Sequence, residues 1–324
     1  MQLKRLLTGL ISALSLLAGA THAQDAYPSR PIKLVVPQTS GTDQVARMLA
    51  EHLSNSLQQA VVVDNRVGAN GMIAAVAVAK EKPDGYTLMF GIVSQMTMNQ
   101  LVYKNVPYDG FRDFTWIAPV TDLAWLLVAS KSSGIKTVND LYARAKAEPG
   151  KLNYASSGTG NMTHLSLAML ASRAGLKMQH VPYKGAAPAM TSVISGESDL
   201  LVMVTNAVLP QIQSGNIVPL AVLGPSRIKA LPNLPTFAES SSAIALPKVP
   251  GWTALVGPSG MSDAVREKLA QAVHSFLNDP SVKAKLLALS IEAIPGSGAE
   301  FQRNSRSETD IWARFIAENN ILAD

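Results

Sequence analysis

A segment rich in glycine and hydroxyl side chains is the part of this sequence best suited to hold an anion. Its residues are Ser156, Ser157, Gly158, Thr159, Gly160 and Asn161. The glycines permit unusual torsions and a close backbone approach, and the hydroxyls can donate hydrogen bonds. A predicted helix follows directly, and its first N–H groups favour a carboxylate. An ordinary helix cap uses the same residue types, so the residues alone leave both interpretations open.

Four further segments follow predicted strands, where open α/β sheets bind their ligands. The first is 37–43, in which Thr42 or Asp43 is alternatively a simple helix cap. Lys184 is alternatively a solvated side chain. The residues of these segments that we predict to contact a ligand are Gln38, Thr39, Ser40, Gly41, Thr42, Ser94, Tyr183, Lys184, Gly185 and Asn206.

Motifs of enzymes and metal sites are missing from the sequence. There is no Gly-x-Ser-x-Gly nucleophile turn and no phosphate-binding Walker loop. Gly158-Thr159-Gly160 lacks the third glycine of a dinucleotide fingerprint. No histidine stands at metal-ligand spacing from another ligand, and only His164, one turn into the helix after the glycine segment, is a candidate ligand contact. We therefore expect no catalysis, no cofactor and no bound metal.

Strands and helices alternate along most of the chain, which predicts an α/β fold with mostly parallel sheets flanked by helices. The predicted strands are 32–36, 61–63, 86–90, 125–129, 151–155, 178–181, 199–204, 218–222 and 252–256. Predicted helices are 46–57, 72–80, 138–148 and 162–174. Two or three more are expected to close the chain, the clearest with Val265, Leu269, Val273 and Phe276 on one face. Thr137 and Asp140 have the spacing of a capping box, and Gly175 is a natural helix stop.

Two strand–helix sets and a long return segment predict two lobes. Residues 225–258 are rich in proline and serine and are predicted to connect the lobes, with a first crossing near 119–123. We assign 24–122 with 251–324 to the first lobe and 123–250 to the second.

The N-terminus has the pattern of a secretory signal. Lys4 and Arg5 precede an apolar run that ends near Ala20, and cleavage is expected after Ala23. The run is shorter than the about 20 residues of a membrane span. The chain has no cysteine, so no disulfide supports the fold. Its formal charge of +5 falls to +3 without Lys4 and Arg5, and no basic block indicates nucleic acid as a partner.

Several segments together resemble one protein family over nearly all of the mature chain. They are 27–32 (YPSRPI), 63–71 (VDNRVGANG), 83–88 (PDGYTL), 154–160 (YASSGTG), 180–185 (HVPYKG), 220–222 (LAV) and 231–236 (LPNLPT). In this order and spacing they resemble the Bug family, the periplasmic solute-binding receptors of tripartite tricarboxylate transporters.

This resemblance implies a two-lobed periplasmic binding protein fold, type II-like, that closes over its ligand in a cleft between the lobes. It implies a small carboxylate ligand (a dicarboxylic, aromatic or amino acid), a periplasmic location and delivery to the membrane permease subunits of a transporter. We expect a monomer. In the family, the loop after the first strand and the Gly-Ser loop of the second lobe bind a carboxylate. The resemblance implies the same role for residues 37–43 and 156–161 of this sequence.

The first loop departs from the family pattern. The family usually has Pro-Phe and a Gly-Gly pair before the Asp, whereas here the loop is two residues shorter, has one glycine, and carries Gln38 in place of Phe. This change puts the identity of the ligand in doubt. Two other functions stay open at this stage, a ligand sensor that signals to a membrane partner and, more remotely, a secreted α/β hydrolase.

Overall fold

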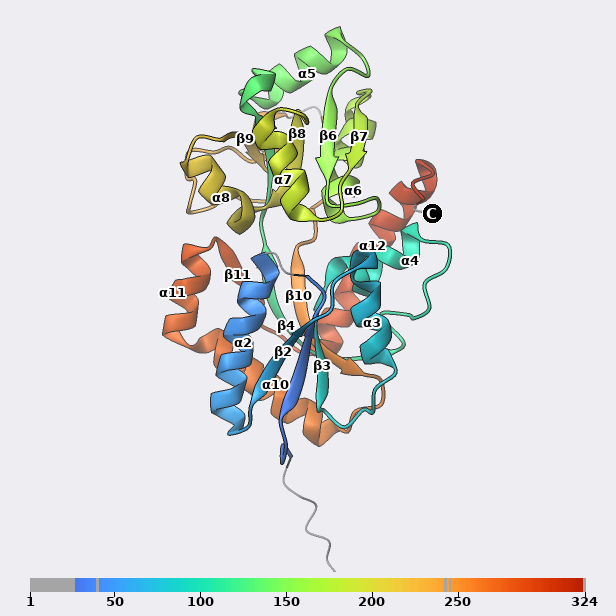
Figure 1. The fold of residues 1–324 in the computed structure, drawn as a ribbon, viewed down its shortest axis with the longest axis vertical. Helices are drawn as coiled ribbons and strands as arrows, with labels where there is room; N and C mark the ends of the chain where they lie inside the picture. Colours follow the sequence, from blue (N-terminus) through green and yellow to red (C-terminus); the bar gives the residue numbers. More distant parts are fainter. Residues whose placement is uncertain (1–26, 39–40, 242–243, 245, 323–324) are drawn as a thin grey trace, which may run out of the picture.

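Eleven strands form two sheets in the part of the chain that the structure describes (Figure 1). The structure is a computed structural model, and it describes residues 27–38, 41–241, 244 and 246–322. Each sheet is flanked by helices, so the molecule has two lobes. This confirms the α/β, two-lobed fold class.

The first lobe contains a six-stranded sheet of order β11-β4-β10-β3-β1-β2. Its strands are β1 (Ile32–Val36), β2 (Val61–Asn65), β3 (Thr87–Ile92), β4 (Phe114–Leu123), β10 (Trp252–Pro258) and β11 (Ile291–Ala293). Its helical elements are α2 (Gly41–Leu57), η1 (Ala69–Gly71), α3 (Met72–Ala79), η2 (Ser94–Met98), α4 (Asn99–Val102), α10 (Asp263–Asn278), α11 (Pro280–Ala288) and α12 (Gly298–Glu318).

The second lobe contains a five-stranded sheet of order β7-β6-β8-β5-β9. Its strands are β5 (Trp125–Ser130), β6 (Asn153–Ser156), β7 (Gln179–Pro182), β8 (Leu200–Val204) and β9 (Ile217–Val222). Its helical elements are η3 (Lys131–Ser133), α5 (Val138–Ala147), α6 (Met162–Ala174), α7 (Ala186–Ser195), α8 (Thr205–Gln213) and α9 (Phe237–Ser240).

Both sheets are mixed, although most of their strands point the same way. β1 runs parallel to β2 and β3, and β6 runs parallel to β7 and β8. β10 is antiparallel to both its neighbours, and so is β5. The physical reason is connectivity, because β5 and β10 are the strands that enter a lobe directly from the other lobe. The helical crossover that makes strands parallel is missing before each of them.

The local signals for helix ends are confirmed. Thr137 and Asp140 form a reciprocal capping box at the start of α5. Gly175 stands in the left-handed conformation just past α6, where a residue with a β-carbon would be strained. The predicted signal segment lies outside the described residues, and the lobe boundaries at 122/123 and 250/251 stay predictions. In the described part of the chain, no helix is long and apolar enough to cross a membrane.

One apolar core is shared by both lobes. It includes Met96 and Val102 of the first lobe together with Met162 and Leu165 of the second, all fully buried. The C-terminal helix α12 adds Trp312 to this core and also bonds to α6, where the Ser172 hydroxyl donates to Asn319 Oδ1 at 2.8 Å. Figure 1 shows α12 and α4 on the side where α6 approaches the first lobe. The lobes are therefore packed together along α6.

Candidate functional site

The junction between the lobes collects the segments that follow several strands. The loop after β6 bonds to the first lobe at two points, from Asn161 Nδ2 to Asn70 Oδ1 at 2.8 Å and from the Tyr103 hydroxyl to the Thr159 carbonyl at 3.2 Å. The glycine-rich segment 156–161 therefore lies at the junction and contacts the lobe to which it does not belong.

Two glycines give this segment its shape. Gly158 and Gly160 have φ angles of +130° and +77°, which disfavour any residue with a side chain. A β-carbon at Gly160 would also lie 2.6 Å from Val102 Cγ1. Asn161 then begins α6, with its side-chain oxygen accepting from the Thr163 N–H at 3.1 Å. The glycines let the loop turn tightly and pack on α4 before the helix starts.

The loop uses most of its own backbone donors. The N–H groups of Ser157, Gly158 and Gly160 donate to Thr163 Oγ1, Ser156 Oγ and His164 Nδ1, at 2.8, 3.2 and 3.2 Å. The Asn161 N–H donates to the Gly158 carbonyl. Within the described residues, no hydrogen bond engages the Thr159 N–H or the hydroxyls of Ser157 and Thr159. The donors that this loop leaves without a partner among the described residues therefore centre on Ser157 and Thr159.

A pair of stacked histidines supports the loop from beneath. The rings of His164 and His180 lie 3.8 Å apart, and His180 Nε2 is 2.6 Å from the fully buried Ser156 Oγ. Burial lowers the pKa of His164 to about 3, helped by the neighbouring His180, and burial lowers the pKa of His180 to about 4. Both rings are therefore neutral at neutral pH, which lets His164 Nδ1 accept from Gly160. His164 is 7% exposed, and its Nδ1 already accepts a hydrogen bond from the loop. The ligand contact predicted for His164 stays a prediction.

The first-lobe loop is held differently. α2 begins at Gly41, so Thr42 and Asp43 lie inside the helix, and the alternative in which one of them caps it does not hold. The Asp43 carboxylate instead accepts from Asn65 Nδ2 at 2.6 Å and from Arg47 Nε at 2.7 Å. Asn65 Nδ2 also donates to the Gln38 carbonyl. Thr39 and Ser40 lie outside the described residues.

Thr42 has an unsatisfied hydroxyl. Its side chain is buried, and Oγ1 finds no hydrogen-bond partner among the described residues. A buried hydroxyl without a partner is costly, so a partner outside the protein would be favoured here.

The remaining predicted residues have varied surroundings. Ser94 is buried at the start of η2, a π-helical turn of a kind that is frequent at functional sites. The Tyr183 hydroxyl lies 3.3 Å from Ser198 Oγ. Lys184 is exposed, Gly185 precedes α7 with a φ of +112°, and Asn206 lies in the first turn of α8.

The sequence interpretation missed the residues that support the loop from other elements. Asn70, Tyr103 and His180 all bond to the segment 156–161 or to its cap, yet none was selected from the sequence. Asn70 had a signal, since an asparagine between Ala69 and Gly71 in a glycine-rich turn is typical of left-handed backbone. His180 and Tyr103 had none, because only the fold brings them to the loop.

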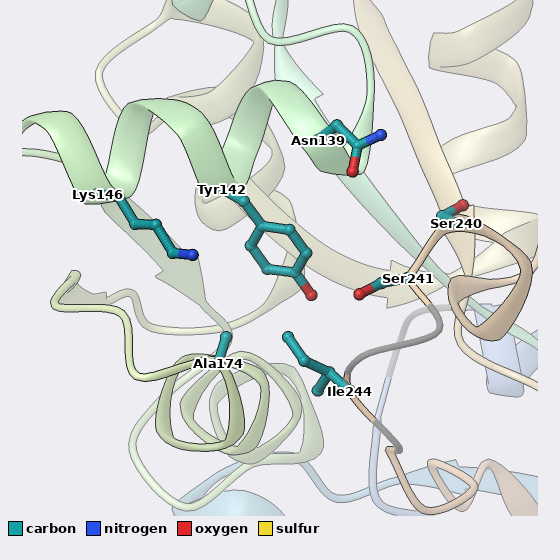
Figure 2. Close-up of a pocket in the computed structure, with 7 residues that line it drawn as sticks. All are labelled: Asn139, Tyr142, Lys146, Ala174, Ser240, Ser241 and Ile244. Carbon is teal, nitrogen blue, oxygen red and sulfur yellow. The ribbon is translucent and has the colours of Figure 1, made fainter.

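A separate cavity lies in the second lobe, away from these loops. It has a volume of about 290 Å³ and lies between α5, the end of α6 and the segment after α9 (Figure 2). Tyr142 and Lys146 point into it from α5 (Figure 2). None of the predicted ligand contacts lines this cavity. The junction loops are better suited to bind a carboxylate because their unused donors stand at a helix N-terminus.

The chain belongs to a receptor family. The family model described as the tripartite tricarboxylate transporter family receptor matches residues 45–321. This confirms the resemblance, and with it the class of solute-binding receptors that serve tripartite transporters.

Individual relatives agree with this assignment. A UPF0065 protein in the tcbD-tcbE intergenic region of Pseudomonas sp. (strain P51) is 34% identical, over 99% of this chain and 96% of that protein. A structure of R. palustris Rpa4515 with adipate is 34% identical, with a TM-score of 0.86 over 91% of this chain and 99% of the other. The periplasmic binding protein BugD is 30% identical, with a TM-score of 0.82 over 92% of this chain and 100% of the other.

Proposed function

We propose that this protein captures a small dicarboxylate at the lobe junction and delivers it to the membrane subunits of a tripartite transporter. The observation that carries the proposal is the set of unused donors at the start of α6, the Thr159 N–H and the hydroxyls of Ser157 and Thr159. They stand at a helix N-terminus, where a negative charge is stabilised. The buried Thr42 hydroxyl is a further donor on the other lobe. The adipate in the R. palustris structure supports the ligand class.

The proposed grip relies on neutral groups. Of the residues predicted to contact the ligand, only Lys184 carries a charge at neutral pH, and its side chain is exposed. Each hydrogen bond to a carboxylate contributes about 1.5–3 kcal/mol, so a few of them bind tightly enough for capture. A grip without a buried ion pair also permits release, because no charged partner is left unpaired when the ligand leaves.

We further propose that the ligand leaves chemically unchanged. Ser156 and His180 are close enough to suggest a nucleophile and its base. However, Ser156 is 0% exposed, and its hydroxyl already accepts from the Gly158 N–H. This arrangement favours a structural role, in which the pair fixes the loop, over attack on a substrate. A periplasmic monomer whose lobes close on the ligand, with a mature chain that begins near Gln24, completes the proposal.

Titration calorimetry on the purified mature protein tests the ligand class. We expect adipate to bind and to raise the melting temperature, since a ligand specific for the folded state stabilises it. Adipamide is the matched control, because it keeps the length of adipate and one carbonyl oxygen at each end but lacks the charges and carries an NH2 donor in place of the second oxygen. Binding of adipamide as tight as that of adipate, or recovery of an altered ligand, would contradict the proposal. An aromatic acid or an amino acid that binds better than adipate would move the ligand to another class of carboxylate.

A further inference from the structure

The turn before α3 has a backbone that few sequences tolerate. Four consecutive residues, Gly68 to Gly71, have positive φ angles, of +124°, +46°, +49° and +82°. Glycine accepts such angles freely and asparagine better than most residues, whereas alanine does not. Asn70 stands third in this turn, with its side chain directed at the second lobe. A backbone of this kind persists only where the surrounding contacts hold it.

Asn70 uses both the nitrogen and the oxygen of its side-chain amide in hydrogen bonds. Its Nδ2 donates to Asn99 Oδ1 at 2.7 Å, while its backbone carbonyl accepts from Asn99 Nδ2 at 3.2 Å. Its Oδ1 accepts from Asn161 Nδ2 at 2.8 Å, across the lobe junction. Asn161 is 7% exposed and caps α6 with its own Oδ1. The donors and acceptors of Asn70 and Asn161 match without an atom to spare, which fixes the orientation of both amides.

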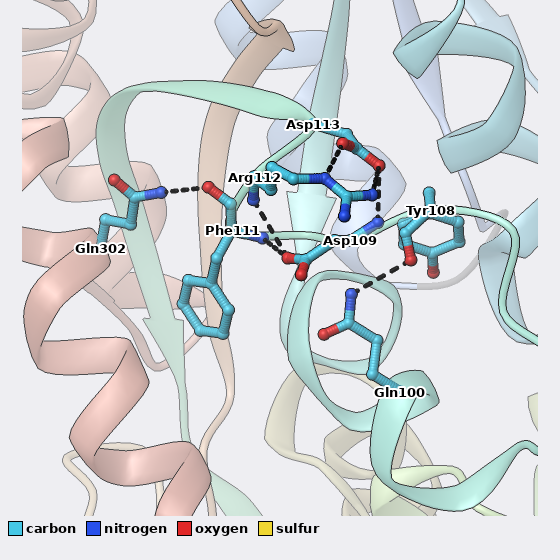
Figure 3. A network of polar contacts seen from close by, with 7 residues as sticks. All are labelled: Gln100, Tyr108, Asp109, Phe111, Arg112, Asp113 and Gln302. Atoms are coloured by element: carbon cyan, nitrogen blue, oxygen red, sulfur yellow. Dashed lines mark hydrogen bonds and ion pairs between the residues drawn. The ribbon is translucent and has the colours of Figure 1, made fainter.

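The first lobe holds its side of this contact firmly. The buried Asn99 also donates to the Tyr108 hydroxyl at 3.1 Å, and that hydroxyl donates to the Gln95 carbonyl at 2.6 Å. Figure 3 shows how the backbone around Tyr108 is held in turn, with Gln100 of α4 donating to the Tyr108 carbonyl. Asp109 caps the following turn, and Gln302 of α12 donates to the Phe111 carbonyl at 2.7 Å. Asn70 is thus bonded to Asn99 of α4, which is linked through Tyr108 to Gln95 of η2.

We propose that Asn70 is a positioning residue that sets the ligand-binding loop of the opposite lobe. It acts through Asn161, the residue at which that loop ends and α6 begins. The Tyr103 hydroxyl and Val102 contact the same loop at Thr159 and Gly160, so the first lobe supports the loop over its second half. The proposal rests on the proposed function, because the loop is there assigned to the ligand carboxylate. It adds that affinity depends on a side chain whose amide nitrogen and oxygen both bond within the protein.

Two variants separate this role from simple stability. Asn70→Gly removes the amide but accepts the left-handed backbone, so the turn itself is preserved. Asn161→Ser keeps a good helix cap but is too short to reach Asn70, so only the contact between the lobes is lost. We expect each variant to weaken adipate binding about tenfold, the effect of one hydrogen bond. The double variant should bind adipate no more weakly than the single variant with the lower affinity, because both changes remove the same contact.

Hydrogen exchange of the ligand-free protein gives a readout that does not depend on the ligand. We expect residues 157–163 to exchange at least about tenfold faster in both variants, while β8 is unchanged. Unchanged exchange in this segment overturns the proposal, and so does adipate affinity equal to that of the wild type in both variants. If the wild type binds no adipate, the proposed ligand class fails, and the exchange measurement still decides whether Asn70 positions the loop. Faster exchange in Asn161→Ser alone would assign the effect to the helix cap and overturn the role of Asn70.

Discussion

The two loops that follow β1 and β6 are both predicted to contact the ligand, but the protein holds them in different ways. The second-lobe loop, 156–161, donates three of its N–H groups to Ser156, Thr163 and His164, and it also bonds to the first lobe. The described part of the first-lobe loop bonds through Gln38 to Asn65 of its own lobe. It is followed by Thr42, whose buried hydroxyl has no partner in the described chain.

This difference indicates that the second-lobe loop and the first-lobe helix contribute to ligand binding in different ways. The second-lobe loop bonds its N–H groups except that of Thr159, so we expect it to present a few donors in fixed positions and to bind with little loss of entropy. The first-lobe helix carries a buried hydroxyl, that of Thr42, with no partner among the described residues, and a hydrogen bond from a ligand would lower its free energy. Substitutions in the second-lobe loop should therefore damage the grip itself. Substitutions in the first-lobe helix should shift the balance between the ligand-free and ligand-bound states.

The largest effect is expected from Gly160→Val. A β-branched side chain at a φ of +77° is strained, and its Cβ would clash with Val102 Cγ1 at 2.6 Å. We expect adipate affinity to fall more than about a hundredfold, together with a lower melting temperature. Gly175→Val is the matched control, because Gly175 also has a positive φ but nothing lies within 4 Å of its Cβ position. If both variants lose stability but keep their affinity, the shape of the loop is not what binds the ligand.

Thr159→Ala tests the donors of the second-lobe loop directly. The change removes one hydroxyl and leaves intact the bond from Tyr103 to the Thr159 carbonyl. Calorimetry should show binding weakened by about ten- to a hundredfold, since a hydrogen bond to a charged group is lost. The control is Thr191→Ala on α7, where the hydroxyl bonds only to its own helix. Wild-type affinity in Thr159→Ala, combined with lost binding in variants of Lys184, would show that the carboxylate does not bind at the loop 156–161.

Thr42→Val addresses the unsatisfied hydroxyl of the first lobe. The valine has the same shape and removes a buried polar atom that has no partner among the described residues. We expect the ligand-free protein to become more stable by about 1 kcal/mol, while adipate binds about tenfold more weakly. Denaturant unfolding and calorimetry measure the two effects separately. A variant that loses stability would show that the hydroxyl has a partner within the protein.

Acid should loosen the second-lobe loop before it affects the first. The pKa values of His164 and His180 are lowered from 6.5 to about 3 and about 4, so the unfolded chain binds more protons below pH 6.5. Stability contributed by the neutral pair is therefore complete above about pH 6.5 and falls as the pH drops toward 3. The melting temperature should follow this curve, and a His164→Gln, His180→Gln double variant should show a flatter one. An equally steep curve in the variant would assign the acid sensitivity to carboxylates such as Asp113, whose pKa is lowered by Arg112.

The smallest effect on binding is expected from Asp43→Ala. Asp43 lies in the first turn of α2 and bonds to Asn65 and Arg47, so its loss should cost about 1 kcal/mol of stability. Affinity should change less than about threefold, because Asp43 faces its own lobe. A larger loss of affinity would show that the first-lobe loop is positioned as strictly as the second-lobe loop.

Most strands of the fold were predictable because their signals are local, but β4 and β11 were missed. Apolar periodicity, the capping box at Thr137 and the stop at Gly175 act between residues close in sequence. The glycine-rich segment 156–161 was selected for the same reason, since its composition by itself favours a tight turn before a helix. The start of α2 was misjudged because Thr42 and Asp43 are common cap residues, and nothing local shows that the helix begins at Gly41.

The sequence by itself determined nine of the eleven strands, the family resemblance and the segments predicted to hold a carboxylate, whereas β4 and β11 were not predicted. Only the tertiary structure decided which donors of those segments are still unused. Ser156, His164 and His180 meet because β6 pairs with β7 and α6 packs beside them. Asn70 reaches Asn161 from 91 residues away in the chain. Hydrogen bonds between elements depend on how those elements pack, and no local pattern of residues carries that information.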